Sequence, residues 1–163
     1  VALRRTCSML HAVLTISMPQ IDLETFRRDA EPFLADHWRE VAKHRDLMVL
    51  APDWPRYEAL AAAGALVIVG AYVGDRMVGY AMSFATTHLH YVGLVSCAND
   101  VLYVDPAYRK GRLGLQLIYE TERLARERGA KIITWHAKEG TSLQALLPRL
   151  GYEVHEVIYS KRL

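Results

Sequence analysis

The sequence predicts a mixed α/β fold, and two kinds of pattern point to it. Short apolar runs bounded by Gly, Pro or Asp are typical of strands, whereas apolar residues three and four positions apart are typical of amphipathic helices. In chain order these patterns give a strand, two helices, three strands, a helix, a strand, a helix and a final strand. We expect one domain, 1–163, in which residues 1–10 form an extension, because 163 residues suffice for a single sizeable core.

Residues 11–104 hold the first six predicted segments. A strand is expected at 11–17, and a helix over 31–44, where Phe33, Leu34, His37, Trp38 and Val41 recur at helical spacing. A second helix is expected to begin at Asp53 or Trp54, with Pro55 in its first turn, and to end at Gly64. The strands that follow are predicted at 66–72, 77–84 and 89–104.

The third of these strands is expected to be bent or bulged, because Gly93 and the polar pair Asn99-Asp100 interrupt it. The next helix is predicted to end at Gly129. The remaining segments are a strand at 131–137, a short helix at 143–150 and a last strand at 152–160.

The stretch 99–118 has the clearest pattern in the chain. The apolar run 101–104 ends at the turn signal Asp105-Pro106, which is typical of a buried strand, and a helical pattern follows. Between them lie three basic residues and two glycines, in the order Arg109, Lys110, Gly111, Arg112 and Gly114. A basic glycine-rich loop at a helix N-terminus presents free N–H groups and the positive end of the helix dipole, so a phosphate or pyrophosphate site is expected.

This stretch resembles the acetyl-coenzyme A motif of the GNAT N-acetyltransferase superfamily. The motif reads Arg or Gln, two residues of any kind, Gly, any residue, then Gly or Ala. Its first residue falls on Arg109 and its last glycine on Gly114, while its middle glycine falls on Arg112, one position after Gly111. The Leu-Gly-Tyr at 150–152 also resembles the common Leu-Gly-Phe of this family.

The resemblance implies a GNAT-like fold: a mixed, mostly antiparallel central sheet with one splayed strand pair and helices on both faces. It also implies acetyl-coenzyme A as co-substrate and transfer of its acetyl group to a primary amine of a small molecule or protein. Pantetheine would enter between the splayed strands, and His136 would line this wedge. The other implied cofactor contacts are the main chain of Leu102, Tyr103 and Val104 and the loop residues Arg109, Lys110, Gly111, Arg112, Leu113 and Gly114.

Asp100 is the candidate catalytic base. It lies four residues before Val104, where many members of the superfamily carry a catalytic Glu or His, and strand alternation would put it on the same face as Leu102 and Val104. Alternatively, the carboxylate beside Asn99 serves only a structural hydrogen bond. A backbone N–H of Val101 or Leu102 is expected to meet the oxyanion.

No residue is assigned as the proton donor to the leaving thiolate. The positions where the family often has a tyrosine and an asparagine fall on Leu147 and Gly140, so neither role carries over. Tyr103, Tyr119 and Tyr152 are alternatives, although each also fits a core aromatic with its hydroxyl at the rim.

Two histidines are candidates for the acceptor site. His37 lies in the apolar stripe of the first helix, where it is either a hydrogen-bonded core residue or a group that borders the acceptor, and His90 is expected to line the acceptor pocket. A metal site made from His88, His90, His136 and Cys97 is not expected, because the sequence supplies no tight third and fourth ligand.

Composition and charge narrow the classes of function that remain for this chain. The net charge of +2 and the glutamates among the arginines of 112–128 argue against a nucleic-acid surface, and no stretch is apolar for long enough to span a membrane. Two cysteines without a spacing motif favour a cytoplasmic location. A non-catalytic acyl-coenzyme A binding module is the alternative function, and the resemblance allows a homodimer through sheet edges.

Overall fold

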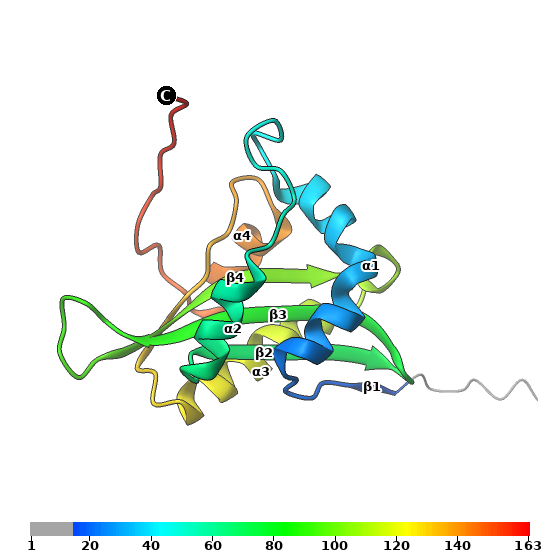
Figure 1. Cartoon of the computed structure of the whole chain (residues 1–163), viewed down its shortest axis with the longest axis horizontal. Helices are drawn as coiled ribbons and strands as arrows, with labels where there is room; N and C mark the ends of the chain where they lie inside the picture. Colours follow the sequence, from blue (N-terminus) through cyan, green and yellow to red (C-terminus); the bar gives the residue numbers. More distant parts are fainter. Residues whose placement is uncertain (1–14) are drawn as a thin grey trace, which may run out of the picture.

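The computed structural model describes residues 15–163, which form one central sheet with helices on both faces (Figure 1). The five strands lie in the order β1-β2-β3-β4-β5, and all neighbours are antiparallel except β4 and β5. The strands are β1 (Ile16–Ser17), β2 (Leu66–Val73), β3 (Arg76–Thr87), β4 (Val95–Val104) and β5 (Ile132–Thr134). The α-helices are α1 (Leu23–Val41), α2 (Trp54–Ala62), α3 (Leu113–Glu127) and α4 (Ser142–Leu146). The predicted mixed α/β architecture is confirmed.

Two apolar clusters separate the faces of the sheet. Helices α1 and α2 lie on one face, where Phe26 and Ala30 of α1 pack with Tyr80, Met82 and Tyr103 of the strands. Helix α3 covers the other face, where its leucines pack against valines of β2 and β3. Because β2 and β3 are covered on both sides, their residues are buried almost without interruption.

Helix α1 begins earlier than the sequence pattern predicts. Its N-cap is Asp22, whose side chain accepts a hydrogen bond from the backbone N–H of Thr25, and Pro32 lies inside the helix. The expected start at residue 31 is therefore wrong, because the apolar stripe used for the prediction begins only at Phe33. Helix α2 has the expected start, with Asp53 as its N-cap.

The strands β2 and β3 form the expected hairpin, whose turn contains Gly74 in the left-handed region at φ 58°. Residues 88–94 form turns, so β4 begins at residue 95 and not near residue 89. Of the first predicted strand, 11–17, the positions 11–14 lie outside the described residues and only Ile16–Ser17 is a strand.

The expected bulge in β4 is present, and Asp100 is its extra residue. Met82 of β3 pairs with Val101 and Ser83 pairs with Asn99, so Asp100 has no partner across the ladder. A bulge changes which face the following side chains occupy. Val101 and Tyr103 pack on the α1 side, whereas Leu102 and Val104 pack on the α3 side.

The strands β4 and β5 splay apart as expected. They pair only through residues 96–98 of β4 and the three residues of β5, so the edge of β4 from residue 99 to residue 104 lacks a neighbouring strand among the described residues. The side chain of Asn99 accepts a hydrogen bond from the backbone N–H of His136 at the point where the strands diverge. The wedge thus opens toward the loop that precedes α3.

The C-terminal end differs from the sequence prediction. Strand β5 spans three residues of the seven predicted, and residues 152–160 form no strand. Residues 153–163 are exposed along their whole length, and in Figure 1 this segment leaves the body of the molecule. A strand needs a hydrogen-bonded neighbour, and this segment has none among residues 15–163. The alternating apolar pattern alone was therefore misleading.

None of the helices formed by residues 15–163 is both long enough and apolar enough to cross a membrane.

Candidate active site

A cavity of about 520 Å³ lies on the α1 and α2 side of the sheet. Its walls come from α1, from the loop between α1 and α2, from α2, and from strands β3 and β4. Most of the lining is apolar, and Asp100 is the only carboxylate that residues 15–163 contribute to it. The lining includes His37, Trp38, Val49, Trp54, Tyr57, Tyr80, Met82 and Asp100.

Asp100 faces this cavity because of the bulge. The expectation that it shares a face with Leu102 and Val104 is wrong, since those two side chains pack on the α3 side. The hydroxyl of Tyr57 on α2 donates a 2.6 Å hydrogen bond to Asp100 Oδ2. Burial and this carboxylate raise the pKa of Tyr57, so its hydroxyl stays a donor at neutral pH. The ring of Tyr57 stacks on Phe84, which holds the hydroxyl in place.

His37 lies deeper in the same cavity and is part of the core. Its Nδ1 is 2.8 Å from the hydroxyl of Tyr80, and its ring packs against Tyr103. Burial lowers the pKa of His37 to about 4, so the imidazole is neutral at pH 7. Burial also raises the pKa of Tyr80. The structure thus makes His37 a hydrogen-bonded core residue whose ring also borders the cavity, and its role toward an acceptor stays a prediction.

The free edge of β4 adjoins this site. The carbonyl of Val104 accepts a 2.8 Å hydrogen bond from Arg109 Nε on the wedge side, whereas the N–H of Asp105 bonds to Val78 of β3. Main-chain groups of successive strand residues point in alternate directions. The N–H and C=O of Leu102 and Val104 therefore face the wedge, and those of Tyr103 face β3.

The loop before α3 ends in a helix N-terminus with open donors. Arg112 is the N-cap residue, and no side chain accepts a hydrogen bond from the first turn. A Cβ on Gly111 or Gly114 would meet nothing closer than 3.7 Å, and neither glycine has a left-handed φ. The free protein would therefore accept alanine at both positions. Glycine here leaves room for a ligand to approach the backbone.

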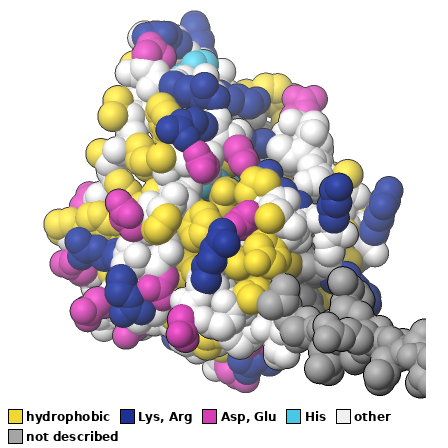
Figure 2. All heavy atoms as spheres, turned by 90° about the vertical axis from the view of Figure 1, so that its right-hand side faces the viewer, with side chains coloured by type: hydrophobic (Ala, Val, Ile, Leu, Met, Phe, Trp, Pro, Cys, Tyr) yellow, Lys and Arg dark blue, Asp and Glu magenta, His cyan; other side chains and the backbone are white. Residues whose placement is uncertain are grey.

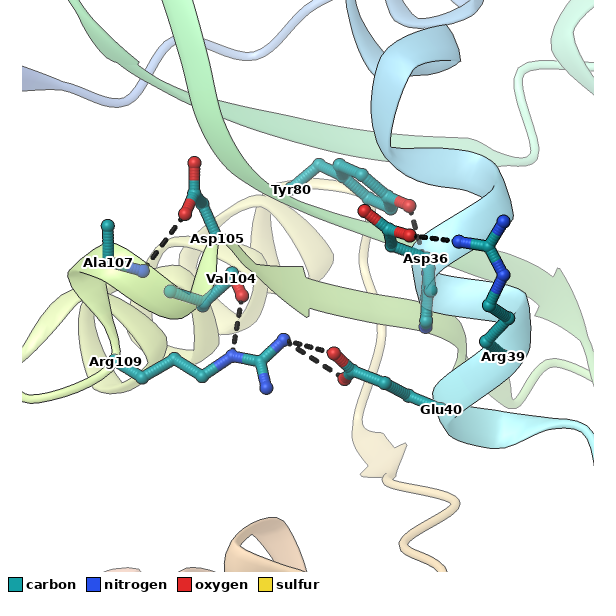
Figure 3. A network of polar contacts seen from close by, with 9 residues as sticks. Asp36, Arg39, Glu40, Tyr80, Val104, Asp105, Ala107 and Arg109 are labelled. Atoms are coloured by element: carbon teal, nitrogen blue, oxygen red, sulfur yellow. Dashed lines mark hydrogen bonds and ion pairs between the residues drawn. The ribbon is translucent and has the colours of Figure 1, made fainter.

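Arg109 is engaged by α1 and β4, as Figure 3 shows. Its guanidinium bonds both carboxylate oxygens of Glu40 on α1, at 2.7 and 3.0 Å, and the carbonyl of Val104. It also lies 5.5 Å from the ring centre of Tyr103. Arg109 thus ties the loop to α1, while Lys110 and Arg112 are exposed and form no ion pair with any of residues 15–163.

The sequence matches the model of the acetyltransferase (GNAT) family over residues 23–152. The chain belongs to this family. It is an acetyl-coenzyme A-dependent acyltransferase, as the resemblance of the stretch 99–118 implied. No curated protein matches the sequence.

Solved structures of other GNAT proteins share the fold at low sequence identity. A ribosomal-protein-alanine N-acetyltransferase from Brucella melitensis biovar Abortus 2308 is 19% identical with a TM-score of 0.67, and the match covers 91% of this chain and 100% of that one. The aminoglycoside acetyltransferase meta-AAC0020 from an uncultured soil metagenomic sample, in complex with trehalose, is 17% identical with a TM-score of 0.66, over 91% and 96% of the two chains. AAC(6')-Iy in complex with a bisubstrate analog of coenzyme A is 18% identical with a TM-score of 0.61, over 91% and 99%.

In this GNAT fold, the predicted histidines are not brought together. His90 lies at the exposed β3–β4 turn and does not line the cavity, so its expected place in the acceptor pocket gains no support here and stays a prediction. His136 is exposed beside the wedge, two residues beyond β5. Within residues 15–163, no three His, Cys, Asp or Glu side chains are grouped as metal ligands.

The three tyrosines considered as proton donors occupy different places. Tyr119 is exposed on α3. The hydroxyl of Tyr152 donates to Glu122 of α3 and accepts from Trp135, and burial raises its pKa. The ring of Tyr103 is buried between Phe33 and Tyr80. None of these positions singles out a donor to the thiolate.

Three residues that shape the site were not predicted from the sequence: Tyr57, Glu40 and Asn99. Tyr57 had a usable signal, because it follows Trp54 at helical spacing and extends the same face of α2. The partners of Glu40 and Asn99, which are Arg109 and the backbone of His136, lie 69 and 37 residues away in the chain. No local pattern predicts such pairs.

Proposed function

We propose that this GNAT protein transfers the acetyl group of acetyl-coenzyme A directly to a primary amine, with Asp100 as the base that accepts the amine proton. The observation that supports this most directly is the place of Asp100. The β4 bulge turns its carboxylate into the cavity, at the point where the free edge of the strand begins. An amine in the cavity and a thioester along the edge would therefore meet beside this carboxylate.

Acetyl-coenzyme A supplies an acetyl group activated as a thioester, and the chain offers fitting surfaces for it. In this proposal pantetheine bonds to the wedge-facing groups of Leu102 and Val104, next to Tyr103 and the exposed His136. The diphosphate lies on Lys110, Gly111, Arg112, Leu113 and Gly114, where the N–H groups of α3 are uncapped. Arg109 supports this loop through Glu40.

Asp100 would act directly or through one water molecule. The hydrogen bond from Tyr57 fixes one carboxylate oxygen and leaves the other free to accept a proton or to hold the ammonium group on arrival. The backbone N–H of Leu102 faces the wedge and is the donor that we assign to the acetyl oxygen. These are the three positions that direct acyl transfer needs to have fixed: amine, carbonyl and base.

The test is release of coenzyme A thiol across a panel of amines, with wild type and Asp100→Asn compared. Removing a general base slows turnover by about 10² to 10⁴. We expect kcat to fall in this range while the Kd for acetyl-coenzyme A, from calorimetry, stays within about twofold. Asp75→Asn, in the β2–β3 turn, is the matched control.

Two results would contradict the proposal. Equal turnover by Asp100→Asn removes Asp100 as the base. Binding of acetyl-coenzyme A without thiol release or acetylated product for any amine would leave the non-catalytic acyl-coenzyme A binding module.

We further infer that two copies of the chain pair through the outer edge of β5. This strand is last in the sheet formed by the described residues, and its Ile132 is 42% exposed. The exposed segment 153–163 follows β5 in the chain and carries apolar side chains that a second copy could cover.

A further inference from the structure

The acceptor cavity carries little charge. Of the residues that the structure describes, Asp100 alone contributes a carboxylate to the wall, and no Lys or Arg of this part of the chain lines it. His37 is neutral at pH 7, since burial lowers its pKa to about 4. The rest of the wall is made of aromatic rings, two methionines and aliphatic side chains: Phe26, Leu34, Trp38, Val41, Met48, Val49, Leu50, Ala51, Pro52, Trp54, Tyr57, Tyr80, Met82 and Val101.

The carboxylates of α1 near this cavity are engaged elsewhere. Asp36 pairs with Arg39 on the outer surface, and Glu40 pairs with Arg109. Figure 3 shows the carboxylate of Glu40 directed at Arg109 and that of Asp36 directed at Arg39. An amine in the cavity therefore meets one negative charge.

The rim of the cavity is also apolar. Met48, Val49 and Leu50 in the loop between α1 and α2 are 52%, 71% and 40% exposed. The indole N–H of Trp38 donates to the carbonyl of Met48, which fixes this loop over the cavity. Exposed apolar side chains around an apolar hollow are typical of a surface that a ligand covers.

We propose that the acceptor is a hydrophobic monoamine, a primary amine on an aryl or alkyl skeleton without a second charge. This inference rests on the proposed function, because it takes the cavity as the acceptor site. The ammonium group pairs with Asp100 as it arrives, and the skeleton packs between Trp54, Met82 and the rim.

The composition of the wall disfavours other acceptors. Each further ammonium group of a polyamine or an aminoglycoside would lose its water without gaining a carboxylate. A peptide would bring backbone N–H and C=O groups that an apolar wall leaves unpaired. A carboxylate next to the amine, as in an amino acid, would lie against Asp100.

The experiment compares kcat/KM for four kinds of amine with the full chain and acetyl-coenzyme A. 2-Phenylethylamine and tryptamine are the expected acceptors, phenylalanine carries the added carboxylate, spermidine and kanamycin carry added ammonium groups, and a peptide with a free N-terminal methionine stands for proteins. We expect both monoamines to exceed every other compound by about tenfold or more, the size of a strong pocket preference. A higher kcat/KM for spermidine, kanamycin, phenylalanine or the peptide overturns the inference.

A variant with a carboxylate added to the rim tests whether the low charge of the cavity causes the preference for monoamines. Val49→Asp adds a second carboxylate at an exposed position. The ratio of kcat/KM for spermidine to that for 2-phenylethylamine should therefore rise by roughly fivefold, the effect of one partly exposed ion pair. Val92→Asp is the matched control, because Val92 is fully exposed in the β3–β4 turn and does not line the cavity. An equal shift in both variants, or none in Val49→Asp, contradicts the inference.

Binding separates this inference from the proposed function. If no amine is acetylated, the proposed function fails, and calorimetry with 2-phenylethylamine and spermidine then tests the inference by itself. Saturable binding of 2-phenylethylamine that Val49→Asp weakens would still support a hydrophobic monoamine site. Absence of such binding would overturn it.

Discussion

The hydroxyl group of Tyr57 determines how the Asp100 carboxylate is held. It donates a 2.6 Å hydrogen bond to Oδ2, and the ring is fixed by Phe84 and Trp54. Tyr57→Phe keeps these ring contacts and frees the carboxylate. We expect kcat to fall about tenfold because the base loses its fixed orientation, with the Kd for acetyl-coenzyme A unchanged.

Stopped-flow or steady-state thiol release measures this effect, and thermal unfolding shows whether the fold is intact. Tyr91→Phe is a suitable control, since Tyr91 is exposed in the β3–β4 turn. If Tyr57→Phe retains full kcat, the hydrogen bond has no part in turnover.

His37 makes the stability of the protein depend on pH. Its pKa is lowered to about 4 in the folded state, while an unperturbed histidine titrates near 6.5. Between these values the unfolded chain binds a proton that the folded chain does not, so the free energy of unfolding falls as pH is lowered from about 6.5 to about 4. The loss amounts to at most about 3 kcal/mol.

Urea unfolding at pH 7 and at pH 4.5 measures this loss. His37→Gln can keep a hydrogen bond to Tyr80 but cannot titrate, so its stability should change less between the two pH values than that of wild type. His90→Gln, exposed in the turn, should behave as wild type does. The same pH dependence in wild type and His37→Gln would show that other groups cause it.

Residue by residue, the sequence identified the candidate base but not its surroundings. Asp100 was chosen because it lies four residues before Val104, where the resemblance to the GNAT superfamily implies a catalytic Glu or His. Its face was predicted wrongly, because an extra residue in a strand reverses the alternation after it. Tyr57 and Asp100 are 43 residues apart, and only the fold brings them together.

Among the elements, those with two independent signals were predicted best. Helix α2 had an N-cap, a proline in its first turn and a closing glycine, and its bounds agree closely with the structure. Helix α1 was predicted from its apolar stripe alone, which begins at Phe33, so its first turns after the N-cap Asp22 were missed. The segment 152–160 had only weak alternation and forms no strand.

The basic residues of the loop between β4 and α3 differ in their contacts. Lys110 and Arg112 are exposed beside the uncapped N-terminus of α3, whereas Arg109 is engaged with Glu40 and Val104. We expect Lys110→Ala with Arg112→Ala to weaken binding of coenzyme A about tenfold at low salt and less at high salt, because charge attraction is screened. The measurement is calorimetry at two salt concentrations.

Arg109→Ala is the informative comparison for this loop. It should lower the free energy of unfolding by about 1 kcal/mol, because the pair with Glu40 and the contact with Tyr103 are lost. Glu40→Gln should give part of the same loss. Unchanged affinity in the double variant of Lys110 and Arg112 would place the diphosphate elsewhere.

Across the described residues, charges of both signs are mixed, and β5 is one of the two edge strands of the sheet. On the face in Figure 2, Lys and Arg side chains alternate with Asp and Glu around hydrophobic patches. On α3, Arg123 pairs with Glu120 and Glu127, and Arg126 pairs with Glu122. This arrangement lacks the uniform basic patch that binding to a phosphate backbone uses.

The outer edge of β5 has no neighbouring strand among the described residues, so it can accept a strand from a second chain. A sheet edge with unpaired N–H and C=O groups readily takes another strand, and the exposed segment 153–163 carries Val157, Ile158 and Tyr159 at 66%, 71% and 90% exposure. In a homodimer the segment of one copy would add to the edge of the other. We expect size-exclusion chromatography with light scattering to give twice the mass of one chain.

Ile158→Asp should shift this equilibrium to the single chain, because an aspartate placed in a strand-to-strand contact must lose its water. Val92→Asp introduces the same charge at an exposed position far from β5 in the chain and should leave the dimer intact. A single-chain mass for the wild type, or a dimer that Ile158→Asp does not weaken, would rule out pairing through this segment. The acetyltransferase cavity lies on α1 and α2, so turnover per chain should be the same in both variants.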